Sequence, residues 1–280
     1  MKNKVILLVV FLIIIFITIL FIFNNNDSYY VPDGFNIIED NIDNGMIIKD
    51  ENDNEFVWIP VSGIDISRKY YDSGKLISVN SEEAIDRIYF GEEAKYYILY
   101  KYIKDDYKYS IEAFLKSINK YKGFYISRYE ISEYDDKIAS RKGINPLINI
   151  TRDEALDKSI NMYNNKDIVS SLINSYAWDI VLDVISKKDS SYLDNKDNTN
   201  KEIMNTGESN DIIYNIYDLS SNVSEWTTEY SNNGYYTYKS PCVERGNNYS
   251  DEYRNPVTRV YNGLDAKNKF TGFRVILYKY

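Results

Sequence analysis

The feature that most limits how this chain can fold is an uninterrupted apolar run at residues 5–23, VILLVVFLIIIFITILFIF. The run carries no charge, and Thr18 is its single polar residue. At about 1.5 Å rise per residue, a helix of this length spans about 28 Å, close to the thickness of a bilayer core. Because such a helix has no polar face to present to water, the run predicts a transmembrane helix.

The charges on either side of the run indicate how that helix is oriented. Lys2 and Lys4 precede it, whereas residues 24–27 are three asparagines and an aspartate. Positive charge collects on the cytoplasmic side of membrane proteins. We therefore expect residues 1–23 to form an uncleaved signal anchor in the cell membrane. The N-terminus would be cytoplasmic, and residues 24–34 would be a tether to an extracellular C-terminal domain.

Two alternatives to an uncleaved anchor stay open at this stage. A cleaved signal peptide would have a shorter apolar core followed by a cleavage site with small residues, and neither is present here. A buried helix of a soluble domain would show apolar and polar faces, and this run shows no such division. Both alternatives fit the residues less well than the anchor.

The overall charge argues against nucleic acid as a partner. The 280 residues contain 33 lysines and arginines against 42 aspartates and glutamates, giving a net charge of −9 and a pI near 4.8. Nucleic-acid-binding domains need a basic face. Without Lys2 and Lys4 the exterior part carries two positive charges fewer, a net of −11. We expect that part to be soluble and to be repelled by anionic lipid headgroups.

Two residue types that catalysis often uses are nearly missing. The chain has no histidine and one cysteine, Cys242. A His-containing triad, a His-ligated metal, a Cys-cluster metal site and an internal disulfide are therefore impossible. The composition leaves enzyme activity uncertain and makes it less expected than binding. No copper, iron or zinc is expected.

The patterning along the exterior part predicts an α+β fold. Two apolar runs around an acidic turn at residues 45–61 indicate a β-hairpin. Apolar residues recur at helical spacing in three segments, 111–118, 151–160 and 178–185. We expect Gly123 to end the first of these helices and a capping box to begin the second. Short apolar runs follow, and the polar stretch 187–211 is expected to be an irregular loop. Residues 62–109 fit no clear pattern and are treated as an unassigned insertion in a domain of residues 35–280.

Six short motifs follow one another in the order and spacing of one known family. They are GFYISRYEIS at 123–132, PLINIT at 146–151, AWD at 177–179, NIYDLSSNVSEWT at 215–227, RGNNY at 245–249 and GFRV at 272–275. Together they resemble the formylglycine-generating enzyme, or sulfatase-modifying factor, superfamily. That resemblance implies a variant of the C-type lectin fold, here preceded by one transmembrane helix.

The resemblance does not extend to the family's reaction. Formylglycine-generating enzymes bind copper through two cysteines, and the matching positions here are Asp251 and Pro256. Neither side chain can act as a thiolate ligand. Family members that handle iron and oxygen need histidines, which this chain lacks. The chain resembles the scaffold of the family without its catalytic cysteines, so no catalytic residue is assigned.

Calcium is the family cofactor that the remaining residues could bind, because it needs only oxygen ligands. The resemblance implies a structural calcium held by the side chains of Asn222 and Glu225 and the backbone oxygen of Val223. In the alternative interpretation Asn222 caps a turn and Glu225 is a solvated charge. The three tryptophans, Trp58, Trp178 and Trp226, are expected in the core rather than in a sugar site.

Loops rich in tyrosine and asparagine are the predicted ligand-binding residues. Rigid aromatic rings beside small polar groups are typical of adaptable recognition loops. The residues singled out are Tyr235, Tyr236, Asn247, Asn248, Tyr249 and Asp251. We expect them to bind an unknown protein or saccharide.

Two other functions remain as alternatives to ligand binding. One is an enzyme that takes its acids from Asp251, Glu252 or Glu244, with Arg245 as an electrostatic partner. The other is a structural subunit of the envelope. The sequence leaves the ligand and the oligomeric state unknown.

Overall fold

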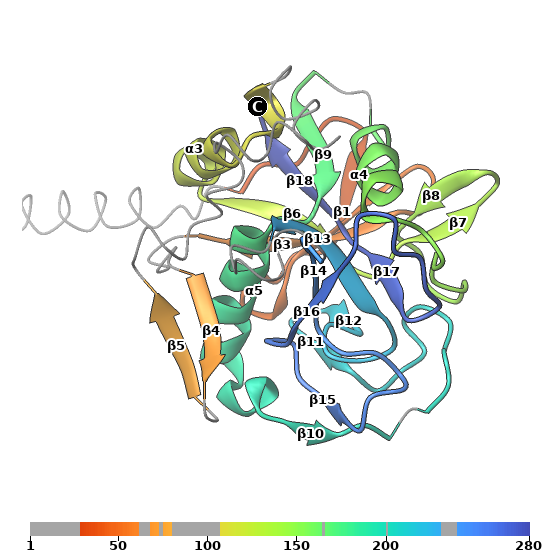
Figure 1. The fold of residues 1–280 in the computed structure, drawn as a ribbon. Coiled ribbons are helices and arrows are strands. Elements are labelled where there is room, and N and C mark those ends of the chain that lie inside the picture. Colours follow the sequence, from red (N-terminus) through yellow and green to blue (C-terminus); the bar gives the residue numbers. More distant parts are fainter. Residues whose placement is uncertain are drawn as a thin grey trace, which may run out of the picture.

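The computed structural model describes residues 29–61, 68–72, 75–79, 107–163, 166–199, 201–230 and 240–280. Its main element is a six-stranded antiparallel sheet in the order β1-β2-β3-β6-β18-β9 (Figure 1). The strands are β1 (Phe35–Glu39), β2 (Ile47–Asp50), β3 (Glu55–Pro60), β6 (Gly123–Ser127), β18 (Val275–Lys279) and β9 (Ile168–Leu172). The last strand of the chain, β18, thus lies inside the sheet between β6 and β9, which come much earlier in the sequence.

A four-stranded sheet and several two-stranded ones make up the rest of the β structure. The four-stranded sheet has the order β16-β14-β13-β17, and its β13–β17 pair is parallel. Its strands are β16 (Arg259–Asn262), β14 (Cys242–Arg245), β13 (Ser224–Tyr230) and β17 (Thr271–Phe273). The two-stranded pairs are β4 (Arg68–Asp72) with β5 (Lys75–Val79), β7 (Ser132–Tyr134) with β8 (Lys137–Ala139), β10 (Lys196–Asp197) with β15 (Tyr253–Arg254), and β11 (Ile212–Ile213) with β12 (Ile216–Tyr217).

Three described α-helices pack on the six-stranded sheet, and each begins at a capping side chain. The helices are α3 (Ile111–Tyr121), α4 (Arg152–Ile160) and α5 (Ser175–Lys188). Ser110, Thr151 and Asn174 accept hydrogen bonds from the backbone N–H three residues later, which satisfies donors that a helix start leaves free. At α4 the Glu154 carboxylate also bonds back to Thr151, completing the capping box that the sequence predicted.

The core lies on both faces of the six-stranded sheet because side chains alternate along each strand. Val57 and Ile59 of β3 point to the face covered by α3 and α5, and Phe56 and Trp58 point to the face covered by α4 and β13. The α+β class is confirmed. The prediction that the three tryptophans are core residues is confirmed as well: their relative exposures are 0–2% (Trp58, Trp178 and Trp226).

The end of α3 differs from the sequence-based expectation. The helix ends at Lys122, which takes the left-handed conformation at φ 63°, and Gly123 is already the first residue of β6. A side chain at Gly123 would place its Cβ 2.2 Å from the Trp58 ring. The glycine is therefore needed for close packing between β6 and β3, and the prediction that it ends the helix is wrong.

The start of the described chain is already packed against the domain. The Tyr30 ring lies 5.6 Å from the Trp58 ring and 5.8 Å from that of Tyr125, whose hydroxyl donates to the Tyr30 carbonyl. Residues 29–34, assigned by sequence to the tether, thus dock on the sheet from Tyr29 onward.

The predicted anchor cannot be compared with the structure. The apolar run at 5–23 lies outside the described residues, as do residues 24–28 of the tether. Within the part of the chain that the structure does describe, no helix is both long and apolar enough to cross a bilayer.

Candidate functional site

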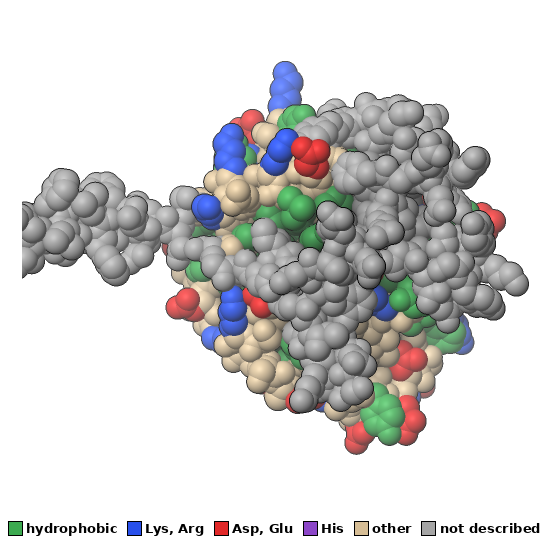
Figure 2. Space-filling view, turned by 60° about the vertical axis from the view of Figure 1, so that its left-hand side comes forward, with side chains coloured by type: hydrophobic (Ala, Val, Ile, Leu, Met, Phe, Trp, Pro, Cys, Tyr) green, Lys and Arg blue, Asp and Glu red, His purple; other side chains and the backbone are tan. Residues whose placement is uncertain are grey.

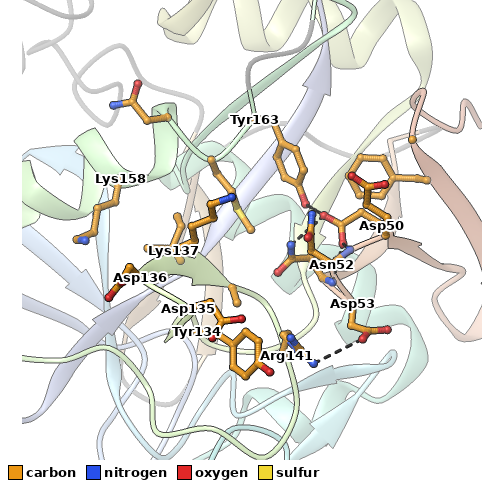
Figure 3. A pocket seen from close by; sticks show the side chains of 18 of the residues that line it. Asp50, Asn52, Asp53, Tyr134, Asp135, Asp136, Lys137, Arg141, Lys158 and Tyr163 are labelled. Carbon is orange, nitrogen blue, oxygen red and sulfur yellow. Dashed lines mark hydrogen bonds and ion pairs between the residues drawn. The ribbon is translucent and has the colours of Figure 1, made fainter.

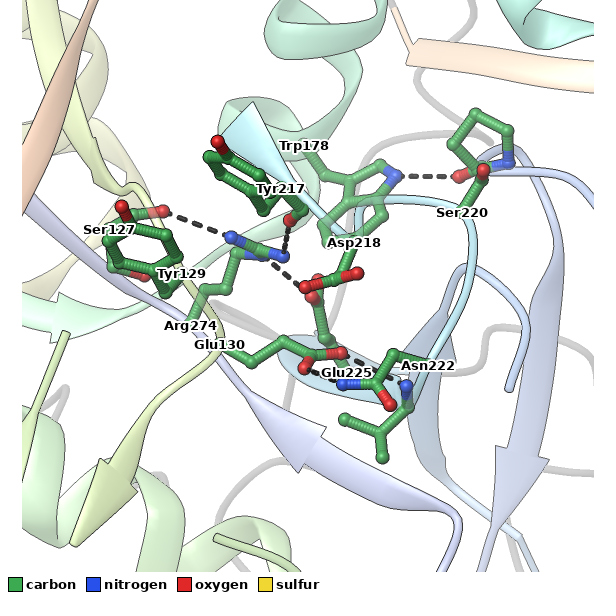
Figure 4. A network of polar contacts seen from close by, with 12 residues as sticks. Ser127, Tyr129, Glu130, Trp178, Tyr217, Asp218, Ser220, Asn222, Glu225 and Arg274 are labelled. Atoms are coloured by element: carbon green, nitrogen blue, oxygen red, sulfur yellow. Dashed lines mark hydrogen bonds and ion pairs between the residues drawn. The ribbon is translucent and has the colours of Figure 1, made fainter. Parts of the chain in front are cut away.

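The motif residues 222–225 belong to a buried polar network rather than to a surface site (Figure 4). Glu130 follows β6, and its carboxylate accepts hydrogen bonds from Nδ2 of Asn222 at 2.5 Å and from the Val223 N–H at 3.0 Å. Asn222 adopts a left-handed conformation, φ 61°, which asparagine tolerates better than most residues. The Asn-Val pair thereby fixes the loop before β13 onto the end of β6.

Arg274, between β17 and β18, connects this network to three other segments. Its Nε donates to Oε1 of Glu225 at 2.6 Å. Its Nη1 donates to the carbonyls of Ser127 and Arg128, and its Nη2 to the carbonyl of Tyr217. The carboxylate hydrogen-bonded to Arg274 is therefore that of Glu225, while Glu130 accepts from Asn222 and Val223.

Burial raises the pKa of each carboxyl group in this network. Desolvation raises the pKa of Glu225 to about 8, although Arg274 opposes the shift. Desolvation likewise raises the pKa of Asp218 to about 6 and raises that of Glu130 well above its usual value, where Asp218 adds to the effect. Desolvation is the largest cause of all three shifts, and Arg274 opposes each of them. The network is sealed from solvent, so its role is to hold the loops together.

The predicted calcium ligands are placed in this network. Oδ1 of Asn222 accepts from the Met204 N–H at 2.9 Å, and Oε1 of Glu225 accepts from Arg274. Oε2 of Glu225 is buried and has no hydrogen-bond partner among the described residues. In that part of the chain no group of three or more acidic or cysteine side chains is arranged to hold a metal. The donor set shown here is small for an ion that takes six to eight oxygens. Calcium binding stays a prediction.

A second buried charge cluster contains the arginine that the enzyme alternative requires. Arg245 contacts Asp179 at 2.8 Å and Glu229 at 3.3 Å, and Arg259 contacts the other oxygens of the same two carboxylates. Arg245 is fully buried. Glu244 is buried too, and desolvation raises its pKa to about 7. These groups join α5, β13, β14 and β16, and the side chain of Arg245 faces protein rather than solvent.

The predicted recognition residues after β14 form one closed loop. Nδ2 of Asn247 and the N–H of Asn248 donate to Oδ2 of Asp251, at 3.0 and 2.9 Å. Oδ1 of Asn247 accepts from Asn255 N–H and Thr258 Oγ1. The side chains of Asn247 and Asp251 therefore hold the loop itself.

The remaining predicted recognition residues divide between this loop and undescribed chain. The Tyr249 ring lies 5.4 Å from that of Phe270, and the Tyr249 N–H donates to the Asn222 carbonyl. Tyr249 thus joins the loop to the buried network. Tyr235 and Tyr236 lie outside the described residues.

An open groove of about 1020 Å³ lies elsewhere, between the β2–β3 turn, the β7–β8 hairpin and the end of α4 (Figure 3). Its lining is mostly polar. Seven acidic residues line it, Asp33, Asp50, Glu51, Asp53, Asp135, Asp136 and Asp157, with three basic ones, Lys137, Arg141 and Lys158. The excess of carboxylates gives the groove a negative potential.

The groove walls are fixed by local hydrogen bonds and turns. Oδ1 of Asp50 accepts from the N–H groups of Asn52 and Asn54, and its Oδ2 accepts from the Tyr163 hydroxyl at 2.7 Å. At the hairpin tip, Asp135 and Asp136 have φ 51° and 59°. Two positive φ values in a two-residue loop are the mark of a type I′ turn. The turn presents both carboxylates to the groove.

One aromatic ring on the groove is accessible, but a cation lies over it. Tyr134 is 47% exposed, and the Arg141 guanidinium lies 4.1 Å from the centre of its ring. Arg141 also reaches Asp53 across the groove at 3.5 Å. Sequence reasoning missed this site. The Tyr-Asp-Asp-Lys segment at 134–137 is a hairpin signal that could have predicted one wall of the groove. No local pattern in the sequence connects this hairpin to the other two walls, the β2–β3 turn and the end of α4.

The comparisons support the fold and give no sequence family. No family model matches the chain, and no curated protein does. Among solved structures, PvdO from Pseudomonas aeruginosa superposes with a TM-score of 0.50 at 12% identity, over 84% of this chain and 98% of PvdO. CarF matches with a TM-score of 0.40 at 14% identity, over 55% of this chain and 86% of its own. Variable protein 1 of Treponema denticola matches with a TM-score of 0.38 at 11% identity, over 79% of this chain and 95% of its own.

Of these three structures, PvdO is the one whose match is close enough to carry an argument, and at 12% identity that argument concerns the fold alone. PvdO has a formylglycine-generating-enzyme-like fold. The mixed α+β architecture of this chain is similar to it along most of both proteins.

Proposed function

We propose that this chain is a membrane-anchored, extracytoplasmic binding domain built on a formylglycine-generating-enzyme-like scaffold of the C-type lectin type. The observation that carries the binding role is the open groove between the β2–β3 turn, the β7–β8 hairpin and α4. Its volume of about 1020 Å³ is at the upper end of small-molecule sites. An open, polar groove of this size suits a segment of a larger ligand better than an enclosed metabolite.

The charge of the groove favours a protein segment with lysine or arginine side chains as the ligand. Seven acidic residues against three basic ones attract cations. A saccharide would use an open aromatic face, and Arg141 already covers one side of Tyr134. The saccharide is therefore the alternative outcome of the test. The enzyme alternative has less support, because Arg245 is buried and occupied by Asp179 and Glu229.

Photo-crosslinking from two positions tests the groove. Tyr134 on the groove and Tyr253 on β15 are both 47% exposed, so a photoreactive phenylalanine analogue at either position has equal access to solvent. With the full chain on intact cells, we expect a protein to be captured from position 134 and not from 253. Capture of a saccharide instead of a protein would make the ligand of the groove a saccharide. Equal capture from both positions, or none from 134, would contradict the groove as a binding site.

A charge-matched pair of variants then tests the reason for binding. Asp135→Asn with Asp136→Asn removes two groove carboxylates and keeps a residue type that accepts positive φ. Glu202→Gln with Glu208→Gln removes two exposed carboxylates outside the groove lining. We expect the first pair to weaken binding of the captured protein and to reduce its salt dependence, and the second pair to leave both unchanged.

A further inference from the structure

The chain enters the described domain beside a surface that is rich in lysine and tyrosine. The Tyr30 ring lies 5.9 Å from the Tyr121 ring at the end of α3. Nζ of Lys279, at the end of β18, lies 5.5 Å from the centre of the Tyr30 ring and 5.3 Å from that of Tyr121. The first described residues, the end of α3 and the end of β18 therefore meet at one place.

More lysines lie on and beside α3. Lys116, Lys120 and Lys122 are exposed, and Nζ of Lys120 lies 4.7 Å from the centre of the Tyr121 ring. Lys108 precedes the helix, with its ammonium 4.9 Å from the Tyr109 ring centre, and its carbonyl accepts from the Tyr278 hydroxyl of β18. We call this surface the basic-aromatic face, made of Lys108, Lys116, Lys120, Lys122, Lys279, Tyr30, Tyr109 and Tyr121.

Among the described residues, acidic groups are few on this face. Glu112 is paired with Lys116 at 2.7 Å, and Asp167 lies beside the chain end, where its carbonyl accepts from the Tyr280 N–H. Figure 2 turns the α3 side toward the viewer and shows several lysine and arginine side chains along its upper part. The positive charge is local, because the chain as a whole has a net charge of −9.

The connection to the apolar run limits how far this face can move from a bilayer. Residues 24–28 separate residue 23 from Tyr29, and a fully extended chain covers at most about 3.6 Å per residue. The link therefore spans at most about 20 Å. If residues 5–23 cross the bilayer, the part of the domain that can reach the headgroups is the part around Tyr29 and Tyr30.

We propose that the basic-aromatic face lies against the anionic headgroups of the membrane in which residues 5–23 are anchored. This inference rests on the anchoring part of the proposed function. Lysines close to a membrane are attracted by anionic lipids, and tyrosines favour the headgroup level because their rings are apolar and their hydroxyls polar. Charges more than about 8 Å away are screened at physiological salt. The local lysines therefore decide the contact, rather than the acidic total.

The contact would set the direction in which the groove faces. The β7–β8 hairpin, one wall of the groove, lies on the opposite side of the domain from α3 (Figure 1). A domain that rests on α3 keeps the groove turned away from the lipid, where it is open to a ligand.

Lipid-borne quenching tests the contact with the full chain in nanodiscs. Asn119 is exposed on α3, and Glu252 is exposed beside β15. A fluorophore is attached to Asn119→Cys or, as the control, to Glu252→Cys. The native Cys242 is buried, and burial raises its pKa to about 11, so it stays unlabelled. We expect a headgroup-attached quencher to quench the label at 119 in discs with anionic lipid, and the label at 252 far less. Equal quenching at both sites would overturn the proposal.

Charge variants separate a specific contact from simple proximity. Lys120→Gln with Lys122→Gln should lower the ratio of docked to undocked domain about 25-fold, or about fivefold for each lysine. Lys137→Gln with Lys142→Gln, on the groove side, should leave it unchanged. An equal loss with both pairs would contradict the proposal.

A flotation assay with the same full chain reports on the anchor by itself. A chain that floats with liposomes in high salt, yet shows no quenching at 119, disproves the face and leaves the anchor standing. A chain that does not float disproves the anchor and the inference with it.

Discussion

Nε of Arg274 lies 2.6 Å from Oε1 of Glu225 in the interior of the domain, although 49 residues separate them in the sequence. Both side chains are 0–1% exposed. The pair joins β13 to the turn between β17 and β18, and the Arg274 guanidinium also reaches carbonyls at 127, 128 and 217. The motif residues that resemble an enzyme family thus form a polar interior that positions loops.

Arg274→Met should destabilise the domain strongly. Removing the guanidinium leaves the buried oxygen of Glu225 and the carbonyls at 127, 128 and 217 without this donor, and each buried acceptor left unsatisfied costs about 1–3 kcal/mol. Glu225→Gln keeps the shape and a hydrogen-bond acceptor, so it should cost much less. Urea unfolding of both variants measures the difference. Equal losses for the two would show that the bonds from Arg274 to the three carbonyls add nothing to stability.

The pH dependence of stability should follow the buried carboxyl groups. The folded pKa of Glu225 is about 8 and that of Glu244 about 7, both above the usual 4.5 because of burial. A carboxyl group with a raised pKa holds its proton in the folded state after the unfolded chain has lost it. For Glu225, the contribution of this proton to the free energy of unfolding is complete below about pH 4.5 and is lost as the pH rises to about 8.

Unfolding of the native chain and of Glu225→Gln across this range checks the sign. The free energy of unfolding of the native chain should fall between pH 5 and 8, and the variant should show a shallower fall. The difference between the two curves cancels the contribution of other groups. A free energy of unfolding that falls as steeply in Glu225→Gln as in the native chain would contradict the raised pKa of Glu225.

Much of the fold could be predicted because its signals are local. The capping box at Thr151 and Glu154 and the hairpin β2–β3 are read from a few adjacent residues, and both are present. The core position of Trp226 was expected from its place in a family motif and from the size of its apolar ring, and it is confirmed. Gly123 was misread because its reason is tertiary: the Trp58 ring occupies the space that a Cβ would need.

The groove and the basic-aromatic face could not be predicted for the same reason. The groove combines the turn at 51–54, the hairpin around Tyr134 and the end of α4, which come together only in the fold. The face combines Tyr30, α3 and Lys279, while the sequence shows only the acidic total. The expectation of repulsion from lipid was drawn from that acidic total and stays a prediction.

Asn247→Ala should loosen the loop between β14 and β15. The side chain accepts from the Asn255 N–H at 2.7 Å and from Thr258 Oγ1 at 3.0 Å, and it donates to Asp251. Losing these partly buried bonds should cost about 1–3 kcal/mol. Hydrogen exchange at Asn255 should rise, whereas Ser250→Ala, which removes an exposed hydrogen bond, should change it little. Unchanged protection in Asn247→Ala would return Asn247 to the set of residues available for a ligand.

Calcium binding through Glu225 predicts a stability difference that one substitution removes. Oε2 of Glu225 is buried and accepts no hydrogen bond from the described residues, so among the predicted calcium ligands it is the side-chain oxygen that would bind an ion without releasing a hydrogen bond. Oδ1 of Asn222 would have to release the Met204 N–H to join it. A ligand that binds only the folded state raises the melting temperature. Calcium in excess over chelator should therefore raise the midpoint of the native chain and leave that of Glu225→Gln unchanged. An equal midpoint with and without calcium in the native chain would show that the arginine-centred network is complete without a metal.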